Sequence, residues 1–327
     1  MVYGSLLVIA VLAAQTPAGF TLHGRITTDK GAPSIRLVLE DPKARNAEVA
    51  RTEADAEGHY EFRGLAGRTY RLVATVAGKK QDRREVEIVC RPGATVSKDF
   101  HYGKTESTLM LYFPAEDPDT VDVAELQGDY SKEVLRDYER AFEDHVNGNI
   151  PRAVQRLEAI AERAPRFYGA HARLGLIFQQ SGCYSDAATE YRRASDVSPR
   201  SAQPLLNLAS AQIRAADVPG QFESSIADAL RTLERVLEIR PGSAVAHCLI
   251  GAAKVRIELY DEAEKSFLRA LEFDGSLGAA QLMLANLYLH QEKWDGAMEQ
   301  LKEYLDDNPF APDRGVVKKM LESARQK

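Results

Sequence analysis

Residues 168–199 read YGAHARLGLIFQQSGCYSDAATEYRRASDVSP, and the architecture of the second half of the chain follows from this segment. It places a small residue at Gly175 and closes on Pro199. The same order of small, aromatic and apolar residues returns later, where Gly251 and Ala285 occupy equivalent places 34 residues apart. A period of about 34 residues is typical of a helical hairpin that stacks repeatedly into a solenoid. We therefore predict an all-α solenoid, an architecture that indicates a binding scaffold and no particular reaction.

Five copies of the pattern align between Ser131 and Pro312, and the third holds extra residues in Ala215–Ser225. The copies resemble the tetratricopeptide repeat. We expect small side chains where paired helices approach too closely for larger ones, at Gly175, Ala209, Gly251 and Ala285 on first helices and at Ala187, Ala229, Ala263 and Ala297 on second helices. Proline disfavours helix continuation, and we expect second helices to end at Pro165, Pro199, Pro241 and Pro309.

A final helix is predicted over residues 313–327, with Asp313 at its start. Val316, Val317, Met320 and Leu321 recur there at helical spacing. A solenoid needs a terminal element that covers its last apolar face. We interpret this segment as the capping helix.

The first half of the chain follows a different rule, in which short alternating segments are separated by turn residues. In Tyr70, Leu72 and Ala74 the apolar side chains alternate with polar ones, as in a half-buried strand. Seven strands in so short a segment indicate a β-sandwich. We expect them at Thr21–Thr28, Ile35–Glu40, Glu48–Ala54, His59–Arg63, Thr69–Ala77, Arg84–Cys90 and Ala94–Tyr102.

Three short motifs give residues 19–103 a resemblance to the carboxypeptidase regulatory-like domain, a transthyretin-like β-sandwich. They are Leu22–Ile26, Asp55–Phe62 and Leu65–Ala74, and Gly58 suits a turn position with positive φ. The resemblance implies a non-catalytic domain that serves structure or recognition. An immunoglobulin-like or fibronectin-like sandwich is the alternative.

Two further segments bear on localisation and on metal binding. Residues 1–14 end in the uncharged apolar run Ser5–Ala14, which we interpret as a signal peptide cleaved after Ala13 or Ala14. An uncleaved anchor is the alternative, although the run is shorter than the roughly 20 residues that span a bilayer. Residues 104–130 form an acidic linker, and its carboxylates at Glu116–Asp122 lack the spacing of a calcium-binding loop.

Composition excludes several classes of function. The formal charge is −6, which provides no basic field for nucleic acid or an anionic membrane surface. Apart from the N-terminal run, no segment is apolar enough to cross a membrane. The three cysteines, Cys90, Cys183 and Cys248, lack CxxC spacing. We predict no disulfide framework, a buried structural role for Cys248 and a free thiol in a hairpin loop for Cys183.

No catalytic, cofactor or metal motif is present. The seven histidines form no HxxxH or HExxH pair, and the sequence contains no GxSxG, Walker or GxGxxG loop. His171 and His247 occupy equivalent places in two first helices, which indicates repeat packing. We predict a protein that is not an enzyme, has no cofactor and binds a protein or peptide partner.

The repeat register also predicts a binding groove along the first helices. Its apolar side chains would hold an extended or helical peptide, and Arg214 and Arg256 would hold the carboxylates of that peptide. Alternatively, both arginines pair with neighbouring Asp and Glu. The predicted groove residues are Ala172, Leu176, Gln179, Gln180, Leu206, Ser210, Ile213, Arg214, Cys248, Ala252, Val255, Arg256, Leu282, Asn286, Leu289 and His290.

The sequence therefore predicts an exported scaffold that mediates protein–protein interaction. Two alternatives remain open. One is carbohydrate recognition or surface adhesion through the β-sandwich, and the other is an accessory subunit of an envelope export or assembly machine. Because both resembled families serve many functions, fold by itself does not select a partner.

Overall fold

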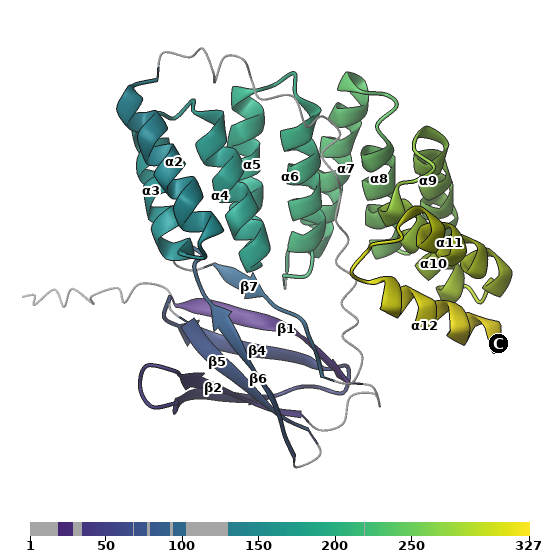
Figure 1. The fold of residues 1–327 in the computed structure, drawn as a ribbon, viewed down its shortest axis with the longest axis horizontal. Helices are drawn as coiled ribbons and strands as arrows, with labels where there is room; N and C mark the ends of the chain where they lie inside the picture. The colour runs from purple at the N-terminus through teal and green to yellow at the C-terminus, as the bar shows by residue number, and fades with distance from the viewer. Residues whose placement is uncertain are drawn as a thin grey trace, which may run out of the picture.

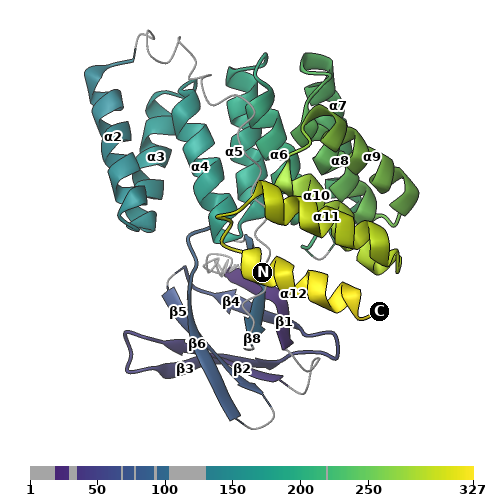
Figure 2. The same cartoon turned by 45° about the vertical axis from the view of Figure 1, so that its right-hand side comes forward.

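The structure is a computed structural model that describes residues 19–28, 35–67, 69–76, 79–91, 94–102, 130–218 and 220–327. The predicted signal peptide and nearly all of the acidic linker lie outside these residues. A β-sandwich is followed by a curved array of helical hairpins, and the sandwich lies against one edge of that array (Figures 1 and 2).

Within the described residues, eight strands form the two sheets of the sandwich. The first sheet has the order β4-β1-β7, and β8 also pairs with β1; the second has the order β3-β2-β5-β6. The strands are β1 (Phe20–Thr28), β2 (Ile35–Asp41), β3 (Ala47–Glu53), β4 (His59–Leu65), β5 (Thr69–Val76), β6 (Lys79–Glu87), β7 (Thr95–Ser97) and β8 (Phe100–Tyr102).

The sandwich core lies between the two sheets, as the alternation predicted. Leu22 and Ile26 of β1 are fully buried, as are Leu37 of β2 and Leu72 of β5. Gly58, in the turn before β4, has φ +89°, which confirms the predicted positive φ. The alternation of apolar residues therefore predicted which face of these strands points into the core.

The predicted strand Ala94–Tyr102 is wrong as a single strand, because residues 98–99 interrupt it. β7 and β8 pair in parallel with successive parts of β1. Between them the Lys98 backbone turns toward β1, where its amide donates to the His23 carbonyl and its own carbonyl accepts from the Tyr60 hydroxyl. A Cβ at Gly24 would lie 1.8 Å from that Lys98 carbonyl oxygen, so only glycine allows the approach. The prediction also set β6 too late in the sequence, at Arg84–Cys90.

In the part of the chain that the structure describes, ten helices form the five predicted hairpins. The first helices are α2 (Lys132–Val146), α4 (Tyr168–Ser181), α6 (Ala202–Ala215), α8 (Ala244–Arg256) and α10 (Gly278–His290). The second helices are α3 (Ile150–Arg163), α5 (Tyr184–Val197), α7 (Phe222–Ile239), α9 (Tyr260–Phe273) and α11 (Trp294–Asp307). α3, α5, α7 and α11 each end two residues before a proline, as predicted, at Pro165, Pro199, Pro241 and Pro309.

Small residues allow the two helices of a hairpin to pack closely. A Cβ at Gly175 would lie 2.6 Å from the ring of Tyr191, and one at Gly251 would lie 2.5 Å from the ring of Phe267. Ala187 is fully buried at the corresponding contact on α5. These distances confirm that close helix approach selects the small residues of the repeat.

The array ends in α12 (Arg314–Arg325), which packs on α11 and confirms the predicted capping helix. Val317 and Leu321 are buried there. Asp313 occupies the N-cap position, but its carboxylate accepts from the Tyr304 hydroxyl at 2.6 Å and does not cap the helix. Among the described residues, no helix is long and apolar enough to cross a membrane.

Candidate functional site

The first helices of successive hairpins approach one another, α2 with α4, α6 with α8 and α8 with α10. They form the inner layer of the array, and we call the surface they carry the inner face. Ala172, Leu176, Gln179, Ser210, Ala252, Val255 and Leu289 are partly exposed on it, and Gln180, Arg214, Arg256, Asn286 and His290 are exposed. The remaining predicted groove residues are buried between helices: Leu206, Ile213, Cys248 and Leu282.

Four of the five exposed residues lie at the last turn of a first helix, at corresponding places along one edge of the inner face: Gln180, Arg214, Arg256 and His290. The two arginines already have an acidic neighbour. Arg256 is 2.5 Å from Asp217, and Arg214 is 3.7 Å from the same carboxylate and 3.1 Å from the Tyr184 hydroxyl. The structure therefore agrees with the alternative interpretation, in which both arginines pair with an acidic residue of the chain itself.

The sandwich lies against this same edge. The Ser97 amide of β7 donates to the Gly182 carbonyl at 3.1 Å. The Lys98 ammonium donates to the Gln180 carbonyl at 3.2 Å, and burial lowers the pKa of Lys98. Gly182 has φ +82°, and a Cβ there would lie 2.2 Å from the Ser97 carbonyl oxygen. Backbone contacts therefore seat the sandwich on the turn between α4 and α5.

A disulfide joins the two halves of the chain, and it overturns two predictions. Cys90, just after β6, is bonded to Cys183 at the start of α5, 93 residues later. Cys183 is 1% exposed and is not a free thiol. Cys248 is fully buried, as predicted, and burial raises the pKa of its thiol. Sequence patterns missed the bond because it depends on how the two domains sit against each other.

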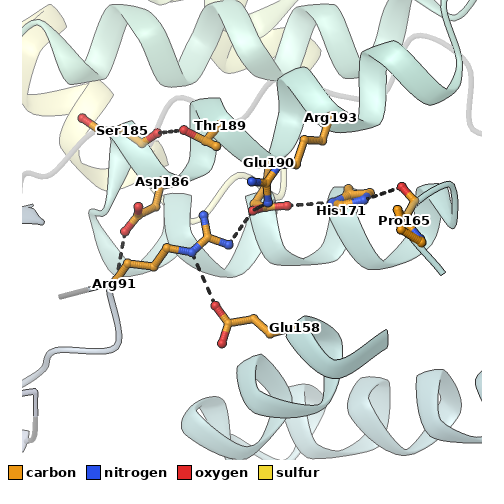
Figure 3. Close-up of polar contacts among 9 residues, drawn as sticks. All are labelled: Arg91, Glu158, Pro165, His171, Ser185, Asp186, Thr189, Glu190 and Arg193. Carbon is orange, nitrogen blue, oxygen red and sulfur yellow. Dashed lines mark hydrogen bonds and ion pairs between the residues drawn. The ribbon is translucent and has the colours of Figure 1, made fainter. Parts of the chain in front are cut away.

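Beside the disulfide lies a buried cluster of charges centred on Glu190 of α5 (Figure 3). Its carboxylate is fully buried and is 2.5 Å from the Arg91 guanidinium and 2.8 Å from Nδ1 of His171. Arg193 also donates to it, at 2.8 Å. Arg91 comes from the sandwich side and makes further contacts with Glu158 and Asp186. The cluster thus ties the sandwich to two hairpins.

His171 links this cluster to the preceding hairpin. Its second ring nitrogen, Nε2, lies 2.9 Å from the Pro165 carbonyl oxygen. Because a carbonyl and a carboxylate are both acceptors, both contacts are hydrogen bonds only when both ring nitrogens carry protons. The equivalent residue His247 instead stacks on Phe273, with ring centroids 5.4 Å apart. The predicted packing role therefore holds for both histidines, through different contacts.

Opposing effects set the pKa of Glu190. Burial would raise it, but hydrogen bonds from His171 and Arg91 and the charges of Arg91 and Arg193 lower it overall. The carboxylate is therefore held ionised inside the protein. Such a cluster is suited to positioning two domains, because Arg91 comes from the sandwich side while His171 and Glu158 come from two hairpins.

The sequence analysis missed a line of exposed apolar side chains on α2, which we call the α2 strip. It consists of Leu135, Phe142 and Val146, which are 38%, 43% and 68% exposed. The repeat period places Phe142 in register with Leu176 and Val146 in register with Gln180. Extending the predicted groove by one repeat toward the N-terminus would have found it.

Side chains of types that can ligate a metal ion come together at two places in the described part of the chain. Asp55, Glu57 and His59 gather at an exposed turn, but the Asp55 carboxylate accepts the backbone amides of the other two. The second group is the disulfide with Asp186. Hydrogen bonding within the turn and the covalent bond account for both groups without a metal ion.

Comparisons with known proteins bear on the helical half. A family model described as tetratricopeptide repeat matches residues 146–194 and 248–312. Comparison with curated proteins finds no match.

Several solved structures are similar in part. A thermophilic tetratricopeptide repeat protein from Thermus thermophilus is 19% identical with a TM-score of 0.49, over 59% of this chain and 100% of its own. PilW, a type IV pilus biogenesis factor, is 16% identical with a TM-score of 0.49, over 60% of this chain and 88% of its own. The pilF protein of Pseudomonas aeruginosa is 17% identical with a TM-score of 0.45, over 59% and 84%. The fold and the family model together establish that the helical half of this chain contains tetratricopeptide repeats.

Proposed function

We propose that this protein is an exported, non-catalytic scaffold that binds a protein partner on the inner face of its repeats. The observation that carries the proposal is the charge of that face. The predicted groove residues include no carboxylate, although the chain has 48 Asp and Glu residues, and the exposed members are polar or basic. Between them lie partly exposed apolar side chains such as Leu176 and Leu289. Such a face suits a peptide with apolar and acidic side chains, whose carboxylates would compete with Asp217 for Arg214 and Arg256.

The disulfide supports export. Disulfides persist in oxidising compartments and are rare where thiols are kept reduced. Cys90 and Cys183 are both buried, so the bond serves structure and is shielded from exchange. Together with the apolar run at Ser5–Ala14, it favours a periplasmic or secreted protein.

The sandwich has a supporting role in this proposal. We propose that residues 19–103 are a carboxypeptidase regulatory-like domain, that 104–130 are a linker, and that 131–312 and 313–327 are repeats and cap. The disulfide, the Glu190 cluster and the backbone contacts at Gly182 all fix the sandwich to the repeat array. A rigid support of this kind would keep the curvature of the array constant.

Affinity co-purification from the native envelope fraction tests the proposed function. The baits are the mature protein and a variant with Arg214 and Arg256 both changed to Glu. A control variant with Arg231→Glu and Arg269→Glu makes the same charge change at exposed positions on second helices. We expect one protein that the first and third baits enrich and the second loses. Equal recovery by all three baits would remove the arginine edge from the site, and recovery by none would contradict the proposed function.

A further inference from the structure

A groove between α2 and α3 of the first hairpin collects arginines. Asp137 lies about 160° round α2 from Leu135, so the groove is on the far side of that helix from the α2 strip. It is a cavity of about 360 Å³ whose lining contains three arginines and a single carboxylate. We call it the arginine groove, and its lining residues are Asp137, Arg152, Gln155, Arg156, Ala159 and Arg163.

The carboxylates at the groove are each shared between arginines. Asp144 lies 2.8 Å from Arg156 and 3.7 Å from Arg152. Asp137 lies 2.7 Å from Arg163 and 3.8 Å from a fourth arginine, on α2. Because the longer contact of each carboxylate goes to an arginine whose side chain is more than half exposed, two of the four guanidiniums are held only loosely.

The surroundings of the groove do not cancel this excess. Glu133, in the first turn of α2, is 3.4 Å from Arg163, so four arginines face three carboxylates. Farther out, helical geometry places Arg136 of α2 on one flank and Glu162 of α3 on the other. Both are exposed, and their opposite charges leave the balance unchanged. The arginine groove therefore retains a net positive charge.

The second hairpin shows what such a groove can hold. With a shift of 34 residues, Arg152 corresponds to Asp186 and Arg156 corresponds to Glu190. These two carboxylates receive Arg91 from the sandwich side, whose guanidinium is 2.5 Å from Glu190 and whose backbone amide donates to Asp186 at 3.0 Å (Figure 3). The first hairpin carries the opposite charge at the same two positions. We therefore expect its groove to receive an anion.

Repeat packing does not require a charge at this register position. In the last three hairpins it holds Thr232, Ser266 and Gln300, which are neutral and at most 9% exposed. Charge occurs in the first two hairpins, where Glu190 meets Arg91 and where Arg156 lines an open cavity. Within the described residues, no group from outside the repeats fills the arginine groove as Arg91 fills its counterpart.

The chain itself supplies an anionic segment. Residues 104–130 contain seven carboxylates and one lysine, a net charge of −6 that equals the formal charge of the whole chain. Four of these carboxylates lie in Glu116–Asp122. By contrast, α12 at the far end of the array exposes Lys318, Lys319 and Arg325, so contact of a second copy through that end would bring like charges together.

Covalent geometry allows this segment to reach the groove. Asp122 is eight residues before Tyr130, and eight residues span up to about 27 Å when extended. Arg163 contacts Glu133 in the first turn of α2, so one end of the groove lies beside the point where the segment joins the repeats. The other end, at Arg152, is 11 residues along α3, a distance of about 16 Å.

From these observations we infer that Glu116–Asp122 of the same chain binds in the arginine groove. Its carboxylates take there, with the sign reversed, the place that Arg91 takes in the second hairpin. Because the segment is tethered to α2, its effective concentration is high and weak, exposed ion pairs suffice to hold it. The groove is not part of the inner face, so this inference is independent of the proposed function.

Site-specific photo-crosslinking in the full mature protein tests the inference. A photoreactive residue is placed at Gln155, which is exposed and lines the groove. The matched control places it at Arg231, an exposed residue at the corresponding register position of α7. At low salt we expect crosslinks from position 155 to Glu116–Asp122 of the same chain, with a yield about fivefold or more above that from position 231.

Two further comparisons test whether charge holds the segment. Asp117→Asn with Asp119→Asn should lower the yield from position 155 about threefold or more, whereas Glu106→Gln with Glu125→Gln, which removes the same charge elsewhere in the linker, should not. Raising the NaCl concentration from about 0.05 M to about 0.5 M should lower the yield with the linker unchanged, because salt screens exposed ion pairs. None of these changes alters a residue of the sandwich or the repeats.

Crosslinks from position 155 to another protein would overturn the inference. Crosslinks to a second copy, which a mixture of isotopically light and heavy chains reveals, would also overturn it. So would an absence of crosslinks to Glu116–Asp122, equal yields in the two neutralised linkers, or a yield that salt does not change. Capture of a partner by the inner face is a separate measurement, and the proposed function stands or falls with that result alone.

Discussion

Replacing Glu190 with glutamine removes the charge on which the contact between sandwich and repeats is centred. Glu190 is fully buried and accepts from Arg91, His171 and Arg193. The substitution keeps the size of the side chain but leaves three donors facing a neutral amide. Removing one partner of a buried ion pair costs about 3–5 kcal/mol.

The structure places this variant near the lower end of that range. Arg91 and Arg193 have 31% and 52% of their side chains exposed, so water can solvate both in part, and Arg91 keeps Glu158. His171 is 3% exposed, so water does not solvate it in the same way. We expect a loss of about 3 kcal/mol in the free energy of unfolding, weighed from these exposures.

Urea denaturation followed by circular dichroism measures that loss, with the disulfide intact in every variant. Arg193→Met is the matched control and should cost less, about 1 kcal/mol, because Arg193 is 52% exposed and Glu190 keeps Arg91 and His171 as partners. In a double-mutant cycle, Arg91→Met and Glu190→Gln should be coupled by at least about 1 kcal/mol. A cost for Glu190→Gln below about 1 kcal/mol, or independent effects of the two changes, would refute the assignment of this cluster as the joint between the domains.

Further predictions concern pH, thiols and packing. Because the folded-state pKa of Glu190 is lowered, its contribution to stability is present above the ordinary pKa of glutamate and is lost as pH falls through the lowered value; acid titration of Glu190→Gln should show a smaller loss over that window, and an unchanged curve would contradict it. Thiol titration should find no reactive cysteine in the native protein, Cys248 after unfolding, and all three after unfolding with reductant; a reactive thiol before unfolding would disprove the disulfide. Ala187→Leu should overpack the contact between α4 and α5 and cost about 1–3 kcal/mol in a thermal melt, and no loss would undercut the repeat alignment. Gly182→Ala should destabilise the protein by about 1–3 kcal/mol through strain at positive φ and collision with Ser97, more than Gly220→Ala, where φ is +80° but the space is open; equal losses would deny the contact.

The repeat array was predictable because its signals are local. Each hairpin repeats the same small residues and the same terminal proline, so helix ends, close contacts and the cap followed from spacing. The third hairpin shows the limit. Its extra residues were expected in a loop at Ala215–Ser225, yet α7 begins at Phe222 and runs for 18 residues. The helix therefore takes up the last four residues of the insertion, from Phe222 to Ser225.

The features missed in the sequence depend on contacts between distant segments. Cys90 and Cys183 are brought together only by the docking of the sandwich. For Arg214 and Arg256, pairing with a neighbouring carboxylate was one of the two sequence interpretations, but Asp217, with which they pair, lies in an irregular turn that the register does not place. The segment Ala94–Tyr102 was predicted as one strand because the turn at Lys98 toward β1 does not disturb the alternation of apolar and polar residues.

Site-specific photo-crosslinking in the native envelope tests the central claim, that a protein partner occupies the inner face of the repeats. A photoreactive residue is placed at Leu176 or Asn286 on the inner face, or at Leu268 or Arg192 on second helices, all in the mature protein. The account predicts a crosslink to one protein from the first two positions and none from the other two. Crosslinks from the outer positions alone, or the same products from all four, would contradict it.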